Sequence, residues 1–491
     1  ILFVLIFVFP SGGVKIGNFN FHFVKLDDFI HQKNPGYQDI SFIMKQSSAI
    51  KADSLAAVYH QSIVLQGKED SIFSNKSNYI NVAFQYQSKG RLGDSLSALF
   101  FPLEFPQGNH RLIYSFFSSL YHLNQTRELI RVLHYGDSQI EGDRITSYIR
   151  NRLQESFGGG GIGLFPVVRG TNLSVSYAQN ISGDWKSFSM NNTSGHQHIN
   201  WGMLGNYATL QKDKKNNFYE GWIDLKRTNF SYPRSYAFHR CTFFYGDNTQ
   251  PMAVTLLGNS GISRAGVLAP AKGINTQTWL LSTTPQQFTF RFWGKSSPKI
   301  YGIAFDDTSG VAVDNIPMRG SLGMNFTSMN IGFLKEMFHL LNIKLVIFQF
   351  GANVVPGLLT NYSFYERHLY YQLRLIRQIQ PGLCVIVMGV SDMSRKNGEN
   401  YESYPNIEKV RDAQRAAAFK AGCMFWDTYQ AMGGKNSMPS WVFSNPSLAR
   451  KDFVHFSPCG AKVIAEMFYN SLQREYRIYC KERSIHTKRK G

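Results

Sequence analysis

A serine that follows a predicted strand is the first residue of this 491-residue chain with a clear chemical possibility. Gly136-Asp137-Ser138 comes after the apolar run 131–135 and before a predicted helix over 142–157. A glycine allows a sharp turn, so the Ser138 hydroxyl could be presented as a nucleophile, with its N–H near the helix start to meet a developing oxyanion. A plain helix cap would give the same tripeptide, so this segment alone decides nothing.

A second candidate segment lies near the C-terminus, where Asp452 and His455 are three positions apart. This spacing lets one loop hold an acid and a base. The carboxylate would fix the imidazole tautomer while the ring takes a proton from a serine. The chain has 13 His, so a single surface histidine is the alternative.

Two further segments could supply donors to an oxyanion. Asn353 follows the apolar run 344–350 and could direct its side-chain N–H at a reacting oxygen, although a turn asparagine is an equally good interpretation. Gly320, after the predicted strand 311–316, could offer a backbone N–H. The same role is open to other glycines, namely Gly258, Gly261 and Gly323.

The elements needed to position these residues alternate between strands and helices. Such alternation predicts a mostly parallel sheet with helices on both faces and a ligand site at the carboxyl ends of the strands. The expected strands are 131–135, 299–305, 311–316, 344–350, 384–388 and 424–426, and the expected helices are 142–157, 326–341, 362–379, 407–421 and 460–472.

The segment 165–298 has a different texture. Short apolar runs alternate there with Asn, Gly, Ser and Thr, which predicts an inserted β-sandwich between two parts of the α/β domain, 126–164 and 299–475. Exposed tryptophans on such a sandwich would suit sugar rings, and buried ones would only fill the core. Five of the seven tryptophans lie in it, at positions 185, 201, 222, 279 and 293.

The two ends of the chain and its net charge support further expectations. The apolar run in 1–13 is expected to be the remnant of a secretory signal, with a buried strand as the alternative. Residues 14–125 form an extension with one amphipathic helix, which is expected to pack on the domain that follows, and 476–491 a basic, solvated tail. The net charge of +19 favours an anionic partner, and without a nucleic-acid-binding motif we expect a wall polymer.

Taken in chain order, Ser138, Gly320, Asn353 and the pair Asp452/His455 resemble the four sequence blocks of the SGNH (GDSL-type) hydrolases. The resemblance covers roughly 125–475. It implies a flavodoxin-like three-layer α/β fold, with Ser138 as nucleophile, His455 as general base and Asp452 orienting that base. It also implies an oxyanion hole formed by the backbone N–H groups of Ser138 and Gly320 and the side chain of Asn353.

The stretch 134–146 and the Gly-rich 157–163 resemble more narrowly the bacterial peptidoglycan O-acetylesterases of that family. Those enzymes also have a sandwich similar to a carbohydrate-binding module between the serine and glycine blocks. Two positions depart from the family pattern: Gln139 replaces the expected Leu, and Val354 replaces a frequent Asp. Asp392 is either a pocket residue or, as we favour, a turn residue.

The resemblance implies an exported serine esterase that removes O-acetyl groups from a cell-wall glycan, needs no metal or organic cofactor, and does not insert stably in a membrane. A polysaccharide O-acetyltransferase with the same triad is one alternative. A glycan-binding protein on a degenerate esterase fold is another. The particular glycan, the oligomeric state and any disulfide pairing stay open at this point.

Overall fold

The computed structural model describes residues 14–16, 19–21, 36–51, 99–168, 176–182, 184–190, 200–213 and 217–488. The predicted signal segment at 1–13 lies outside these residues. Within the described ranges, no helix combines the length and the apolar character that crossing a membrane requires. The five cysteines are free thiols.

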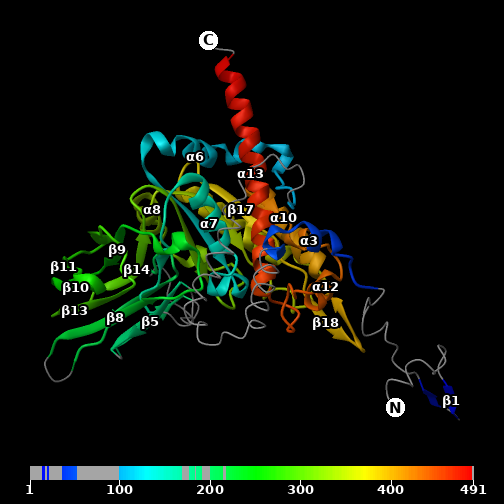
Figure 1. The fold of residues 1–491 in the computed structure, drawn as a ribbon, viewed down its shortest axis with the longest axis horizontal. Coiled ribbons are helices and arrows are strands. Elements are labelled where there is room, and N and C mark those ends of the chain that lie inside the picture. The colour runs from blue at the N-terminus through cyan, green and yellow to red at the C-terminus, as the bar shows by residue number, and fades with distance from the viewer. Residues whose placement is uncertain are drawn as a thin grey trace, which may run out of the picture.

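A five-stranded parallel sheet forms the centre of the α/β part (Figure 1). Its strands lie in the spatial order β15 (Gly310–Pro317), β3 (Leu129–Gly136), β16 (Ile343–Gln349), β17 (Cys384–Met388) and β20 (Met424–Trp426). Numbered along the chain, this order is 2-1-3-4-5, as in flavodoxin. The strand order reverses direction between β3 and β16, which is the place where open α/β sheets bind their ligands.

Helices cover both faces of this sheet because its strands are apolar on both sides. On one face, Val132, Leu345 and Ile386 pack in one core with α6 (Tyr114–Thr126), α7 (Thr146–Phe157) and α13 (Pro458–Lys488). On the other face, Leu133 and Val346 pack with α8 (Ile331–Leu340), α9 (Ser363–Ile379) and α10 (Ile407–Lys420). The predicted parallel sheet with two helical layers is therefore present.

The predicted β-sandwich is also present, as two antiparallel sheets around one aromatic core. Figure 1 shows it in green, on the opposite side of the α/β part from α12. One sheet has the order β11 (Ser263–Leu268), β10 (Met252–Gly258), β13 (Gln287–Gly294), β8 (Tyr219–Arg227) and β5 (Tyr177–Ile181). The other has β12 (Asn275–Leu280), β9 (Arg240–Gly246), β14 (Lys299–Asp306), β7 (Asn206–Leu210) and β6 (Trp185–Ser189), with β4 (Gly163–Phe165) beside β14.

The strand over 299–305 belongs to the sandwich and not, as expected, to the α/β sheet. It is β14, which pairs with β9 and β4. One side of β14, including Ile303, packs in the sandwich core, and the other side, including Tyr301, packs against the core that contains α8. A strand buried on both faces has a continuous apolar sequence even in an antiparallel sheet, which explains the misplacement.

The expected frayed tail is also wrong, because α13 continues without a break to Lys488. Tyr479 in its C-terminal half packs against Tyr114 and Phe117 of the amphipathic helix α6, with ring centroids 5.0 and 5.9 Å apart. The helix therefore has an apolar stripe beyond position 472 that is shared with α6. The packing of α6 on the α/β part agrees with the sequence-based expectation.

The described part of the N-terminal extension is built into the α/β part. Glu104 forms an antiparallel bridge with Phe425 and so covers the outer edge of β20. Smaller elements complete the fold: β1 (Val14–Ile16), β2 (Phe19–Phe21), α3 (Ser41–Gln46), β18 (Ser394–Asn397), β19 (Asn400–Ser403), α11 (Thr428–Ala431) and α12 (Ser437–Phe443).

Candidate active site

Ser138 stands at the carboxyl end of β3, at the place where the strand order reverses. It begins a short 3-10 helix, Ser138–Asp143, and the Asp137 carboxylate before it accepts a hydrogen bond from the Gln139 N–H at 3.0 Å. Gly136 lets the end of β3 lie close to β16, because a Cβ there would lie 2.8 Å from the carbonyl oxygen of Gln349. The side chain of Ser138 is half-buried and reaches the surface.

Asp452 and His455 lie on the loop before α13, which their own hydrogen bonds hold in shape. The Asp452 Oδ1 accepts the backbone N–H groups of Val454 and His455 at 3.0 and 2.9 Å. Phe453 between them has a left-handed backbone (φ 57°) and stacks on Tyr401 with ring centroids 3.6 Å apart. Such strain in a non-glycine residue is typical of functional loops, where the surrounding structure fixes one geometry.

The two loops meet, although Ser138 and His455 are 317 positions apart in the chain. The Ser138 Oγ is 2.8 Å from His455 Nε2, and His455 Nδ1 is 2.8 Å from Asp452 Oδ2. An ionised carboxylate only accepts hydrogen bonds, so Nδ1 holds the ring proton and Nε2 is free to accept from the serine hydroxyl. This arrangement can remove a proton from Ser138.

The electrostatics of the two aspartates differ. Burial acts to raise the pKa of Asp452, but hydrogen bonds from the backbone and ring of His455 and from Val454 N–H outweigh it, so the pKa lies below its usual value. Asp452 is therefore ionised at neutral pH. Asp137 is fully buried, and this burial raises its pKa to about 6, against the opposing effect of hydrogen bonds from Gln139 and Ala352 N–H.

Asn353 and Gly320 lie on neighbouring loops, after β16 and β15. One N–H of the Asn353 side-chain amide donates to the Ser321 carbonyl at 3.1 Å, which leaves the other N–H available. Gly320 has a left-handed backbone (φ 76°) that favours glycine. Among the described residues, the backbone N–H groups of Ser138 and Gly320 donate to no other protein atom.

The other glycines considered for this role are excluded by their hydrogen bonds or by their place in the fold. The Gly323 N–H donates to Ser321 Oγ at 3.0 Å, and the Gly258 N–H donates to Ile262 O at 2.7 Å. Gly258 and Gly261 lie at the turn between β10 and β11 of the sandwich, not at the end of the parallel sheet. Gly320 is therefore the glycine whose position best suits an oxyanion donor.

Asp392 does not line the site. Its buried carboxylate accepts the Ser403 hydroxyl and the Met438 N–H, each at 2.7 Å, and burial raises its pKa to about 6. It therefore joins the β18–β19 hairpin to α12, and it is neither a pocket residue nor the turn residue that we favoured. Within the described residues, no three His, Cys, Asp or Glu side chains gather as a metal site would require.

Two residues that were not predicted from the sequence as part of the site hold its loops: Gln139 joins two of them, and Arg144 braces the serine loop from within. The Gln139 Nε2 donates to Val454 O at 2.6 Å, and its Oε1 accepts the Phe456 N–H at 3.4 Å, so its amide contacts the chain on both sides of His455. Arg144 donates to the carbonyls of Ser138 and Glu141. In the sequence, only the presence of Gln139 in place of the family's Leu pointed to these contacts.

Comparison with known proteins gives structural likenesses only. No protein-family model and no curated protein matches the chain. A solved structure titled "Peptidoglycan O-acetylesterase in action, 5 min" is similar with a TM-score of 0.61 and 24% identity, over 76% of this chain and 99% of that one.

Two other solved structures are similar over shorter parts. One is the acetyl xylan esterase AlAXEase, with a TM-score of 0.26 and 14% identity over 33% of this chain and 81% of that one. The other is a family two carbohydrate esterase from Clostridium thermocellum in complex with cellohexaose, with a TM-score of 0.24 and 7% identity over 52% and 92%. Both are too weak to argue from. The first likeness confirms the resemblance inferred from the sequence: over three quarters of its length, this chain is similar in fold to a peptidoglycan O-acetylesterase.

Proposed function

We propose that this protein is a serine esterase that removes O-acetyl groups from a cell-wall polysaccharide, with peptidoglycan as its foremost substrate. The observation behind the proposal is the unbroken hydrogen-bond chain from Ser138 through His455 to Asp452 at the end of the parallel sheet. A serine, a base and a carboxylate in this order activate the hydroxyl for attack on an ester.

In the first half of the reaction, the Ser138 Oγ attacks the acetyl carbonyl carbon while its proton passes to His455 Nε2. Asp452 accepts from Nδ1 and stabilises the imidazolium that forms. The carbonyl oxygen becomes an oxyanion, which the free N–H groups of Ser138 and Gly320 and the Asn353 amide would stabilise. The C–O bond to the sugar then breaks, and the sugar oxygen takes the proton from Nε2.

In the second half, water gives a proton to His455 Nε2 and its oxygen attacks the acetyl-serine. The second tetrahedral intermediate collapses to acetate, and Ser138 regains its proton from His455. The loop contacts of Asp137 and Gln139 fix the serine and the histidine in place through both halves. Prior fixing of the reacting groups is a large part of what an enzyme supplies.

The choice of substrate rests on two supports. The structure with a similar fold is titled a peptidoglycan O-acetylesterase, and this chain spans 99% of it. The net charge of +19 favours binding to an anionic wall polymer. Action on such a polymer implies that the protein is exported, to the periplasm or beyond.

The two alternatives predict different outcomes. A glycan-binding protein on a degenerate fold has no need to keep Ser138 Oγ and His455 Nε2 at 2.8 Å, so the geometry favours an enzyme. An acetyltransferase would use the same acyl-enzyme and pass the acetyl group to a sugar hydroxyl in place of water. Acetate release with and without an acceptor glycan separates that activity from hydrolysis.

The test is acetate release from O-acetylated peptidoglycan by the wild type and by Ser138→Ala. We expect the variant to lose nearly all activity, because removing one member of a triad leaves only the slow reaction supported by binding and the oxyanion donors. Ser484→Ala, at an exposed serine in the C-terminal half of α13 whose hydroxyl donates to Lys481 O, is the matched control. Equal activity in Ser138→Ala and the wild type would exclude the proposal.

A further inference from the structure

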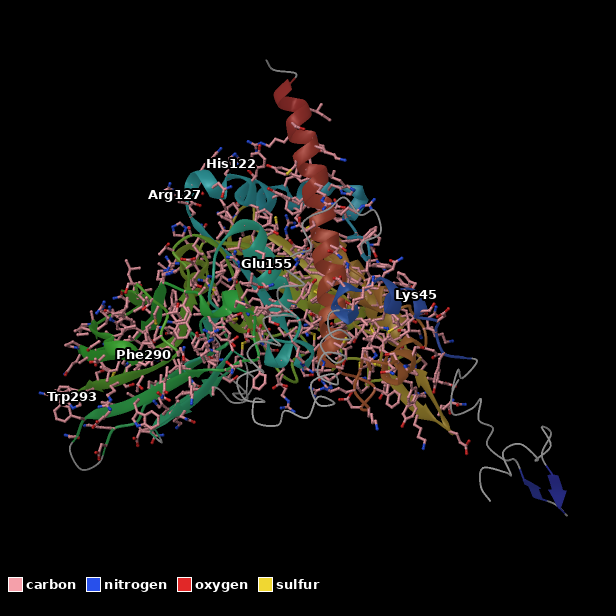
Figure 2. The ribbon with its side chains drawn as sticks, viewed as in Figure 1. Lys45, His122, Arg127, Glu155, Phe290 and Trp293 are labelled. Carbon is pink, nitrogen blue, oxygen red and sulfur yellow. The ribbon has the colours of Figure 1, made fainter. Side chains whose placement is uncertain are left out.

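The outer sheet of the sandwich has one face that no element of the described chain covers. On β8 and β13 the residues alternate: Ile223, Leu225 and Phe290 are buried in the sandwich core, and the residues between them point outward. The other sheet of the sandwich, through β14, packs against the α/β part. Figure 2 shows Trp293, at the end of β13, at the side of the molecule away from the α/β part.

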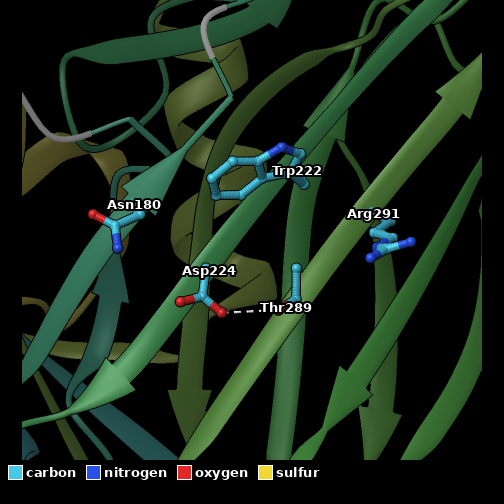
Figure 3. Close-up of a pocket in the computed structure, with 5 residues that line it drawn as sticks. All are labelled: Asn180, Trp222, Asp224, Thr289 and Arg291. Atoms are coloured by element: carbon cyan, nitrogen blue, oxygen red, sulfur yellow. Dashed lines mark hydrogen bonds between the residues drawn. The ribbon is translucent and has the colours of Figure 1, made fainter.

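A pocket of about 290 Å³ opens on this outward face. Figure 3 shows its lining, which comes from three neighbouring strands: Asn180, Trp222, Asp224, Thr289 and Arg291. The strand register sets this cluster, because Arg291 lies directly opposite Trp222, and Thr289 and Asn180 lie opposite Asp224 on either side. Its volume is near the lower end of the roughly 300–1,000 Å³ of small-molecule sites.

Trp222 differs from the structural tryptophans of the same sandwich. Trp185 and Trp279 are buried, and their indole N–H groups donate to backbone carbonyls at 3.3 and 3.0 Å. The Trp222 side chain is 40% exposed, and its indole N–H has no partner among the described residues. Neither core packing nor a hydrogen bond explains a tryptophan at this position.

The groups around Trp222 are suited to hydroxyls. The Asp224 carboxylate accepts the Thr289 hydroxyl at 2.8 Å and the Gln287 amide N–H at 3.3 and 3.2 Å, and its two oxygens have acceptor capacity left. The guanidinium of Arg291 and the amide of Asn180 make no hydrogen bond to any other described side chain or backbone group. A flat apolar ring beside one acceptor and two donors matches a pyranose, which has an apolar C–H face and a rim of hydroxyls.

We propose that this pocket is a glycan-binding subsite, in which one sugar ring of a polysaccharide strand stacks on Trp222. The ring hydroxyls donate to Asp224, and Arg291 and Asn180 donate to sugar oxygens. The inference deepens the proposed function, on which it rests for the identity of the polymer. Binding at this site would supply affinity away from the reacting ester, as remote contacts with a polymer do.

The test measures binding of the full chain to insoluble peptidoglycan from which O-acetyl groups have been removed by base. All variants contain Ser138→Ala, so that catalysis plays no part. Co-sedimentation is performed in about 0.5 M salt, which screens the general attraction between a cationic protein and an anionic polymer. The variants are Trp222→Ala, Trp222→Tyr and Arg291→Ala, and Trp293→Ala is the matched control, because Trp293 is 53% exposed on the same face but outside the pocket.

We expect Trp222→Ala to raise the dissociation constant by about tenfold or more, as for an aromatic residue at the centre of a binding site. Trp222→Tyr restores part of the affinity, Arg291→Ala weakens it, and Trp293→Ala stays within about twofold. With Ser138 intact, hydrolysis of a small soluble acetyl ester by Trp222→Ala stays at the wild-type rate. Undiminished binding by Trp222→Ala, or equal losses in Trp222→Ala and Trp293→Ala, would overturn the subsite even if ester hydrolysis supports the catalytic proposal.

Discussion

Ser138 and His455 come from different loops, and each loop is fixed by hydrogen bonds before the two side chains meet. The Asp137 carboxylate joins the serine loop to the Asn353 loop through the N–H groups of Gln139 and Ala352. The Gln139 amide joins the serine loop to the histidine loop. At the residue scale, the 2.8 Å contact between nucleophile and base therefore depends on Asp137 and Gln139 as positioning residues.

Replacing Gln139 by Leu, the residue expected in the family motif, tests this role. We expect kcat on a small acetyl ester to fall about tenfold with little change in KM, since Val454 O and Phe456 N–H would lose buried partners worth about 1–3 kcal/mol each. Gln473→Leu is the control, because among the described residues that amide bonds only to Tyr469, within α13. An unchanged kcat in Gln139→Leu would show that the amide does not position His455.

Asp137→Asn tests the raised pKa of this residue. The folded-state pKa of about 6 lies above the unfolded value of 3.8, so the stability contributed by protonated Asp137 is fully present below about pH 4 and is lost as the pH rises through 6. The free energy of unfolding of the variant minus that of the wild type should rise by about 3 kcal/mol from pH 4 to 7 and then level off. Urea titrations across this range measure it, and a constant difference would contradict the assignment.

The sequence predicted which residues could take part in the site but not what holds them. Ser138, Asp452, His455 and Asn353 could be proposed because each follows a strand or precedes a helix in a recognisable block. The contacts of the Gln139 amide could not, because they depend on where the His455 loop lies, and that is set by the packing of α13.

The order of the parallel strands is what brings the site together at the scale of elements. Because β15 and β16 flank β3, the loops after these three strands emerge side by side, with Ser138 between Gly320 and Asn353. Alternation of strands and helices was enough to predict this sheet. It did not predict that β14 belongs to the sandwich, because the apolar sequence of this strand reflects burial on both faces. It also did not predict the end of α13, where an apolar stripe lies among many basic residues.

Tyr479→Ala tests whether the C-terminal half of α13 is part of the fold. Tyr479 is buried against Tyr114 and Phe117, so the substitution should lower the free energy of unfolding by about 2–4 kcal/mol, as for other large buried side chains. Ile485→Ala, on the same helix but 52% exposed, should change it by less than about 0.5 kcal/mol. Similar small effects of both would mean that the helix end does not pack on α6 in solution.

At the scale of the whole molecule, a buried ion cluster joins the sandwich to the α/β part. Arg131 on β3 pairs with Asp314 on the neighbouring β15 and with Asp306 at the end of the sandwich strand β14. All three side chains are almost fully buried. The Asp314 carboxylate also accepts the Leu164 N–H at 2.9 Å, next to the start of the sandwich. The cluster therefore stabilises both places where the chain passes between the α/β part and the sandwich.

Arg131→Met should lower the free energy of unfolding by about 3–5 kcal/mol, because it leaves the buried Asp314 carboxylate without its cation and Asp306 with the more distant Arg240, 3.9 Å away. The triple variant Arg131→Met, Asp306→Asn, Asp314→Asn removes those charges and should recover part of the loss. Denaturant titration of both variants gives the comparison. If the triple variant were no more stable than the single one, the cost would come from lost packing and not from unpaired charge.

The central claim is that Ser138 forms a covalent acyl intermediate, and the direct measurement is peptide mapping by mass spectrometry. The protein is incubated with an activated acetyl ester, quenched in acid and digested, with His455→Ala in parallel. The account predicts one acetyl group on the peptide that contains Ser138 in the wild type and a trace at most in His455→Ala, where Ser138 Oγ has lost its base. An acetyl group on another residue, or turnover of the ester without any label on Ser138, would contradict it.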